Sequence, residues 1–280
     1  MYHRRLLSTF ALLALLPLQA IAGFCCLSDK TSSPPAGFVA DVPRGAAPWI
    51  VSLIDAEGKH HCGGVLVAPA WVLTAAICAN PPGENAARVT EVRAGESGQG
   101  GARRVVGVHV HPGWSGNVEQ GEPNLALMRL EGPLPGSPMA LPDGKAPVIA
   151  EEETLIALGR AITNPGEHDG SSNPRLADKW RYVEMPAVGA DRCQAGYPGA
   201  RIEGMICAGR DVPHWSTCSG DSGAPLLRQR WGAASPELLG LVSWGFGCGD
   251  ARQYSVHVAV WPHRDWVRRT IEADASQHAR

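Results

Sequence analysis

The segment Gly220-Asp221-Ser222-Gly223 has the pattern in which a serine hydroxyl can act as a nucleophile on an acyl carbon. A serine hydroxyl is a poor nucleophile until a base removes its proton, so this chemistry also requires a histidine near Ser222. The adjacent pair His60-His61 could supply that base, although a solvated histidine pair at a strand end is the more ordinary interpretation. The four-residue pattern is weak by itself, and its meaning depends on the elements that position it.

His109 and His111 are the other histidines with a suggestive spacing, because alternate residues of a strand can face the same way. A zinc site takes at least three protein ligands, and no third ligand accompanies this pair. We therefore interpret both as surface or packing residues, and we predict neither a metal site nor a cofactor.

The eight cysteines are typical of a protein that folds in an oxidising compartment. Cys25 and Cys26 leave three alternatives open: a bridge between these neighbours, a disulfide to another chain, or free thiols. None of the eight has the Cys-x-x-Cys spacing of a zinc site, so the remaining six indicate three disulfides. These six are Cys62, Cys78, Cys193, Cys207, Cys218 and Cys248.

Residues 1–22 have the features of a secretory signal peptide. Basic residues at positions 3–5 precede an apolar run over 6–16, and small residues follow at 20–22. No later segment reaches the roughly 18 consecutive apolar residues of a membrane helix. The sequence therefore predicts a secreted protein, extracellular or periplasmic, with no membrane segment after signal removal.

The overall composition excludes several classes of protein. A chain of 280 residues with 44% hydrophobic residues, 33 glycines and 23 prolines is not disordered, a coiled coil or collagen-like. The 25 Lys and Arg residues against 27 Asp and Glu residues give a net charge of −2, which offers no basic surface. We therefore expect no nucleic-acid partner.

The pattern of apolar residues after Trp49 predicts an all-β fold, because short apolar runs alternate with turn-forming residues. Residues 23–37 lack such runs and are expected to form an extended arm. Apolar residues spaced by three and four predict a C-terminal helix over 262–273. The predicted strands cover 50–54, 64–67, 71–76, 105–110, 125–130, 155–158, 180–185, 205–208, 225–227, 238–242 and 255–260.

Six segments, in order, resemble the chymotrypsin-like serine endopeptidases over about residues 38–272. They are His61-Cys62-Gly63-Gly64-Val65-Leu66, Trp71-Val72-Leu73-Thr74-Ala75-Ala76, Leu125-Ala126-Leu127-Met128-Arg129-Leu130, Met205-Ile206-Cys207-Ala208-Gly209, Cys218 through Leu226, and Val242-Ser243-Trp244-Gly245. The resemblance implies two six-stranded antiparallel Greek-key β-barrels, over about 38–145 and 146–261, followed by the C-terminal α-helix. It also implies the disulfides Cys62–Cys78, Cys193–Cys207 and Cys218–Cys248.

The resemblance assigns a catalytic triad to three positions, of which only the nucleophile Ser222 is kept. The base position, directly before Cys78, holds Ile77, and the position of the orienting aspartate holds Asn124. Isoleucine accepts no proton, so we predict a catalytically inactive homologue that binds a protein or peptide partner. The alternative is an active endopeptidase or esterase with a relocated base such as His61; Glu122, near Asn124, has no imidazole at position 77 to orient.

The substrate-binding positions implied by the resemblance are better kept than the triad. Gly220 and Ser222 hold the positions of the oxyanion-hole amides. The strand Ser243-Trp244-Gly245 could pair with an extended peptide. The pocket base carries Ser216 and its wall Ser255, which favours a small or medium apolar anchor residue over lysine or arginine.

The activation mechanism of the resembled family is not evident in this chain. Gly37 precedes Phe38 where a basic residue would direct cleavage, so no released terminus is expected to pair with Asp221. Asp221 must then find other partners for the oxyanion loop to be ordered.

Overall fold

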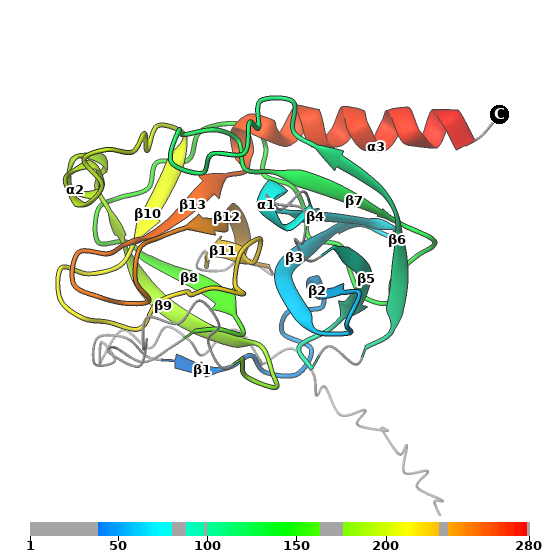
Figure 1. Ribbon diagram of the computed structural model, residues 1–280, viewed down its shortest axis with the longest axis horizontal. Coiled ribbons are helices and arrows are strands. Elements are labelled where there is room, and N and C mark those ends of the chain that lie inside the picture. The colour runs from blue at the N-terminus through cyan, green and yellow to red at the C-terminus, as the bar shows by residue number, and fades with distance from the viewer. Residues whose placement is uncertain (1–38, 80–87, 98–99, 163–175, 230–234, 279–280) are drawn as a thin grey trace, which may run out of the picture. The chain divides into compact units, whose positions relative to one another are not determined.

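The computed structural model describes residues 39–79, 88–97, 100–162, 176–229 and 235–278 (Figure 1). The predicted signal peptide, the arm over 23–37, both cysteines at 25 and 26, and the segment around Phe38 lie outside these residues. Within the described part of the chain, no helix is long and apolar enough to cross a bilayer.

The first barrel is a closed antiparallel sheet in the order β2-β3-β4-β7-β6-β5. Its interior is filled by aliphatic side chains that the strands direct inward, among them the fully buried Leu53, Leu66, Leu73 and Leu127. The strands are β2 (Ile50–Asp55), β3 (His60–Ala68), β4 (Trp71–Thr74), β5 (Val89–Ala94), β6 (Ala102–Val110) and β7 (Ala126–Leu130).

The second barrel closes in the order β8-β9-β10-β13-β12-β11, because β8 pairs with both β9 and β11. Leu155, Val183 and Leu226 lie in its core. The strands are β8 (Thr154–Gly159), β9 (Arg181–Val188), β10 (Met205–Ala208), β11 (Pro225–Arg228), β12 (Glu237–Trp244) and β13 (Ser255–Ala259).

Both barrels have the same strand order, in which the first three strands are followed around the barrel by the sixth, fifth and fourth. This arrangement confirms the predicted all-β class with two six-stranded antiparallel barrels. One boundary differs from the prediction. β1 (Val39–Asp41) falls in the range expected for the first barrel but pairs with β9 of the second, Val39 opposite Val183.

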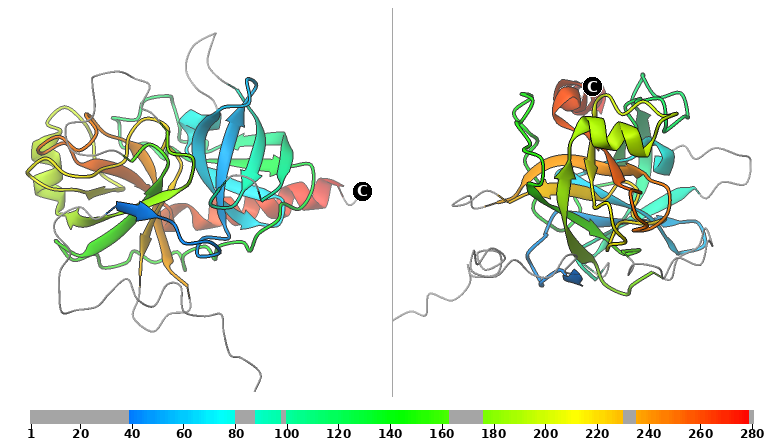
Figure 2. Two further views of the ribbon diagram at one scale, coloured as in Figure 1. Left: turned by 90° about the horizontal axis from the view of Figure 1, so that it is seen from below. Right: turned by 90° about the vertical axis from the view of Figure 1, so that its left-hand side faces the viewer.

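The helices differ from the sequence prediction in number and length. α1 (Ala76–Ala79) replaces the last residues of the strand predicted over 71–76, and α2 (Ala190–Gly196) has no sequence counterpart. After η1 (Trp261–His263), α3 (Arg264–His278) extends five residues beyond the predicted end at 273. Asp274 lies past the last apolar position of the pattern and pairs with Arg129 of β7 at 3.4 Å. This ion pair holds the end of α3 against the first barrel, beside which the helix runs (Figure 2).

The three disulfides pair as the resemblance implies: Cys62–Cys78, Cys193–Cys207 and Cys218–Cys248. The first links β3 to α1 and therefore fixes the position of Ile77 relative to the start of β3. The third links the segment before Ser222 to the loop after β12. Two of the three bridges thus hold the backbone on which the predicted site residues lie.

Hydrogen bonds join the two barrels along the line where the site residues gather. The amide of Gly63 donates to the carbonyl of Ser222 at 2.9 Å. The buried indole of Trp180 donates from Nε1 to Ser52 Oγ at 3.2 Å. These contacts place the Ser222 loop of the second barrel against β3 of the first.

Candidate functional site

The Ser222 loop is a tight turn that only glycine permits at position 223. Gly223 has a φ of +78°, and a Cβ there would lie 2.2 Å from Thr74 Oγ1. Its amide donates to the carbonyl of Val242 at 2.8 Å. The turn therefore packs against both β4 and β12, which fixes the backbone of Ser222 at the junction of the barrels.

Three of the predicted site positions, Ile77, Asn124 and Ser243, are joined by hydrogen bonds. The carboxamide of Asn124 is fully buried; its Oδ1 accepts from the amide of Ile77 at 3.0 Å, and its Nδ2 donates to Ser243 Oγ at 2.9 Å. The side chain of Ile77 offers no acceptor. Within the described part of the chain, Ser222 Oγ has no hydrogen-bond partner.

The two histidines of the pair differ in their contacts. The ring of His60 donates from Nε2 to the carbonyl of Gly220 at 2.9 Å, since a carbonyl oxygen can only accept. Burial lowers the pKa of His60 to about 4, so the ring is neutral at pH 7. His61, the predicted alternative base, lies at a bulge of β3, because Leu53 pairs with Cys62 and Ile54 with His60.

The other polar residues weighed from the sequence have local partners. Glu122 accepts from the amide and hydroxyl of Ser115, and these hydrogen bonds lower its pKa. His109 packs against Trp71 with ring centroids 5.5 Å apart. His111 contacts His263 and Trp266 near the start of α3. These contacts agree with the packing role predicted for the two histidines.

The two backbone amides assigned to the oxyanion hole make no hydrogen bond with a described residue. Neither Gly220 N nor Ser222 N donates to a described group, and Gly220 adopts a φ of +103°. The carboxylate of Asp221 lies beneath them and accepts from the amides of Arg160, Ala161 and Cys218 at 2.7, 2.7 and 2.9 Å. Burial raises the pKa of Asp221 to about 7, although the three amide donors act in the opposite direction.

A cavity of about 160 Å³ opens beside Ser222 and contains most of the predicted pocket residues. Ser243 is not among the lining residues, because its hydroxyl is directed to Asn124 instead. Trp244 forms one wall and contacts the ring of Tyr197, with centroids 4.8 Å apart. The lining residues are Ser216, Thr217, Cys218, Ser219, Ser222, Val242, Trp244, Gly245, Gly247, Cys248, Gln253, Tyr254 and Ser255.

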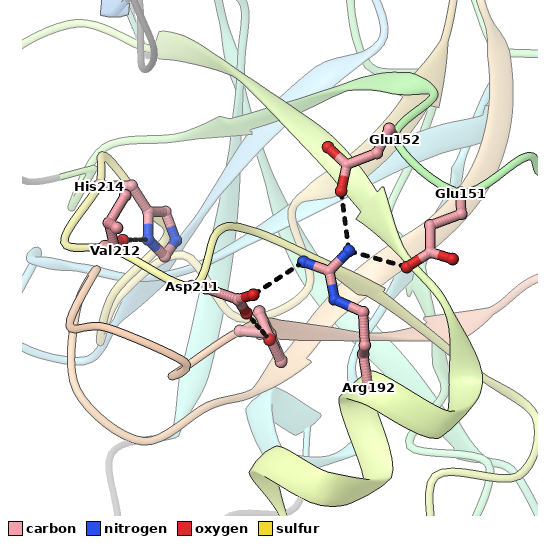
Figure 3. A network of polar contacts seen from close by, with 7 residues as sticks. Glu151, Glu152, Arg192, Asp211, Val212 and His214 are labelled. Atoms are coloured by element: carbon pink, nitrogen blue, oxygen red, sulfur yellow. Dashed lines mark hydrogen bonds and ion pairs between the residues drawn. The ribbon is translucent and has the colours of Figure 1, made fainter.

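A network of ion pairs is centred on Arg192 (Figure 3) and contacts Tyr254, one of the residues that line the cavity. Arg192 of α2 pairs with Glu151 and Glu152 at 2.8 Å and with Asp211 at 3.3 Å. The hydroxyl of Tyr254 donates to Asp211, which lowers the pKa of that carboxyl. The network therefore anchors the loop that leads into β13 at Ser255.

Two residues that the sequence did not single out line this cavity or contact its lining. Thr217 lines it beside Ser216, and the buried His257 contacts the hydroxyl of the lining residue Ser255. The alternation of Ser255, Val256 and His257 along β13 could have placed Ser255 and His257 on one face. Thr217 had no signal of its own beyond its position next to Ser216.

Two antiparallel barrels with a Gly-Asp-Ser-Gly turn and an adjoining pocket at their junction define the chymotrypsin-like class of serine protease folds. The family model for trypsin matches residues 38–267. The chain belongs to the trypsin family.

Several curated relatives show the same kinship. The chain is 34% identical over 246 residues to vitamin K-dependent protein C of Oryctolagus cuniculus, covering 82% of this chain and 50% of that protein. It is 34% identical to serine protease 56 of Mus musculus, over 84% of this chain and 38% of that protein. It is 31% identical to trypsin of Squalus acanthias, over 82% of this chain and 93% of that protein. The chain thus spans half or less of the first two relatives.

The fully buried His257 gives the fold a predicted sensitivity to acid. Burial lowers the pKa of His257 to about 4 from the ordinary 6.5, so the folded state keeps the ring neutral where the unfolded state binds a proton. Its contribution to the unfolding free energy is present above pH 6.5 and is lost as the pH falls toward 4. The loss amounts to roughly 3 kcal/mol at about 1.4 kcal/mol per pKa unit.

Urea unfolding of the parent chain and of His257→Phe at about pH 7 and pH 4 measures this contribution. We expect the parent to lose more unfolding free energy than the variant between these pH values. Asp221, whose raised pKa has the opposite effect, is common to both chains and cancels in the comparison. Equal losses in the two chains would show that His257 does not titrate as its burial implies.

Proposed function

We propose that this chain is a catalytically inactive member of the trypsin family that binds an extended peptide or protein segment in the cleft beside Ser222. The observation that carries the proposal is the hydrogen-bonded arrangement of Asn124 with Ile77 and Ser243. In this arrangement the carboxamide of Asn124 is hydrogen-bonded through both its oxygen and its nitrogen without an imidazole. Proton transfer from Ser222 therefore has no acceptor, while the surrounding backbone is intact.

The peptide-binding half of the proposal is supported by the free edge at the end of β12. Pairing with β11 stops at Pro225 opposite Leu241, whereas pairing with β13 continues to Trp244 opposite Val256. From Ser243 onward, the edge toward β11 has no strand partner among the described residues. An extended peptide can add to such an edge through backbone hydrogen bonds, which need no titratable group.

Export of the protein supports a partner outside the cytoplasm. The three disulfides are stable in oxidising compartments, and the predicted signal peptide would direct the chain there. We therefore propose a secreted protein whose partner is an extracellular or periplasmic peptide or protein, with no cofactor in its function.

Substitution of the cleft wall tests the binding site. Trp244→Ala removes an indole beside the free edge, and we expect it to weaken binding of an extended peptide at least tenfold by calorimetric titration. The control is Val148→Ala, which trims a side chain that is 90% exposed and outside the cleft. Equal affinities of the parent and Trp244→Ala would place the peptide elsewhere and contradict the proposal.

A further inference from the structure

The cavity floor is connected to a buried histidine by a chain of hydrogen bonds. Thr217 Oγ1 lies 2.5 Å from Ser255 Oγ, and Ser255 Oγ lies 3.3 Å from His257 Nε2. On its other side, His257 Nδ1 lies 3.3 Å from the carbonyl of Ile206. All three side chains are buried, so each proton in the chain has few alternatives.

One tautomer of His257 sets the direction of every hydrogen bond in this chain. With the proton on Nδ1, the neutral ring donates to the carbonyl of Ile206, and Nε2 is an acceptor. Ser255 must then donate its hydroxyl proton to His257, and Thr217 must donate its own to Ser255. With its proton donated to Ser255, Thr217 Oγ1 can offer a ligand in the cavity only a lone pair, as a hydrogen-bond acceptor.

Ser216 provides the complementary group on the same floor. Its residue is buried and lines the cavity, and its hydroxyl donates to no described residue. That hydroxyl can rotate to donate to a ligand. The floor therefore offers one fixed acceptor at Thr217 and one available donor at Ser216.

We propose that the cavity selects a peptide with a carboxamide anchor, glutamine or asparagine, whose NH₂ donates to Thr217 and whose carbonyl accepts from Ser216. His257 acts as a positioning residue in this selection, because it directs the proton of Thr217 away from the cavity. The inference rests on the proposed peptide-binding function and names its ligand.

Other side chains meet this floor less well. A glutamate carboxylate would accept from Ser216 but oppose the lone pair of Thr217. Lysine or arginine would bring a charge into a cavity whose described lining residues include no acid. An apolar anchor would match neither the lone pair of Thr217 nor the hydroxyl of Ser216, so the geometry favours a different anchor from the apolar one that the sequence indicated.

The test is calorimetric titration of the parent chain with one extended peptide whose anchor residue is glutamine, glutamate, methionine or lysine. We expect the glutamine peptide to bind at least tenfold more tightly than each of the others. Binding of several peptides with equal affinity, or preference for another anchor, would overturn the carboxamide assignment and leave peptide binding standing. Silence of the whole panel would overturn both.

Two variants locate the source of the preference. Thr217→Val, which keeps the shape of the side chain and removes its hydroxyl, should bring the glutamine-to-methionine ratio of affinities close to one, whereas Thr217→Ser should retain it. His257→Phe should lower the glutamine-to-glutamate ratio at least fivefold and leave methionine affinity within twofold. Unchanged ratios in Thr217→Val and His257→Phe would contradict the assignment, and the parent panel decides it where a variant does not fold.

Discussion

The purified chain is expected to hydrolyse neither casein nor chromogenic peptide substrates above the rate of its own Ser222→Ala variant. The proposed function gives Ser222 no proton acceptor, since Ile77 occupies the position of the base and His60 is hydrogen-bonded to the carbonyl of Gly220. In another serine protease, loss of the histidine alone lowers turnover about a millionfold, or roughly 8 kcal/mol of barrier. Residual rates of that size lie below ordinary assays.

A fluorophosphonate probe makes the same test more sensitive, because it reacts only with an activated serine. We expect no stoichiometric labelling of the parent chain. Labelling that disappears in Ser222→Ala would show that a base exists, and its loss in His61→Ala would then identify that base. Either result would replace the inactive assignment by the alternative of an active enzyme.

The strands could be predicted where the chain forms a short run of mostly apolar residues. β12, an apolar run between Glu237 and Gly245, and β13 both formed close to the predicted bounds. β5 was missed because only Val92 and Ala94 of its six residues are buried, and Thr90, Glu91 and Arg93 interrupt the apolar pattern. Its pairing with β2 and β6, which no local signal carries, is what makes it a strand.

The residues of the candidate site likewise divide into those that could be predicted from the sequence and those that could not. Ser222, Asn124 and Ser216 could be found because each lies in or beside a segment whose order and residue types resemble a known family. Thr217 and His257 could not, because their role depends on protons directed across two strands and a loop. The contact of the Ser243 hydroxyl with Asn124 likewise became visible only when the segment before β7 and β12 were brought together by the fold.

The residues at the two lost triad positions are physically matched to each other. Asn124 is fully buried, and its amide satisfies one donor and one acceptor as a neutral group. A carboxylate at the same place would be a buried charge with no imidazole to stabilise, which is costly in an apolar interior. With isoleucine at position 77, a neutral side chain at position 124 is therefore the more stable choice.

This match leads to a prediction with a large expected gain of function. Ile77→His combined with Asn124→Asp should raise the rate of Ser222 labelling by a fluorophosphonate at least a thousandfold over the parent chain. The backbone contact that would orient the new ring is already present, because the amide of Ile77 donates to the side chain of Asn124. The oxyanion-hole amides of Gly220 and Ser222 are free among the described residues.

The single variants serve as controls, and their expected effects on the rate of Ser222 labelling differ. Asn124→Asp alone should gain nothing and should unfold at lower urea, because it adds a buried charge without a base. Ile77→His alone should gain far less than the double variant, since an asparagine behind the histidine fixes the wrong tautomer and costs about 10⁴ in related enzymes. The double variant should exceed the product of the two single effects.

The result also reports on the oxyanion loop. Asp221 is held by three backbone amides, and no released terminus was expected from the sequence near Phe38. If these amides suffice to order the loop, the double variant gains activity without cleavage of the chain. A folded double variant that labels no faster than the parent would mean that restoring the proton acceptor is not enough, and that the amides of Gly220 and Ser222 do not form a working oxyanion hole.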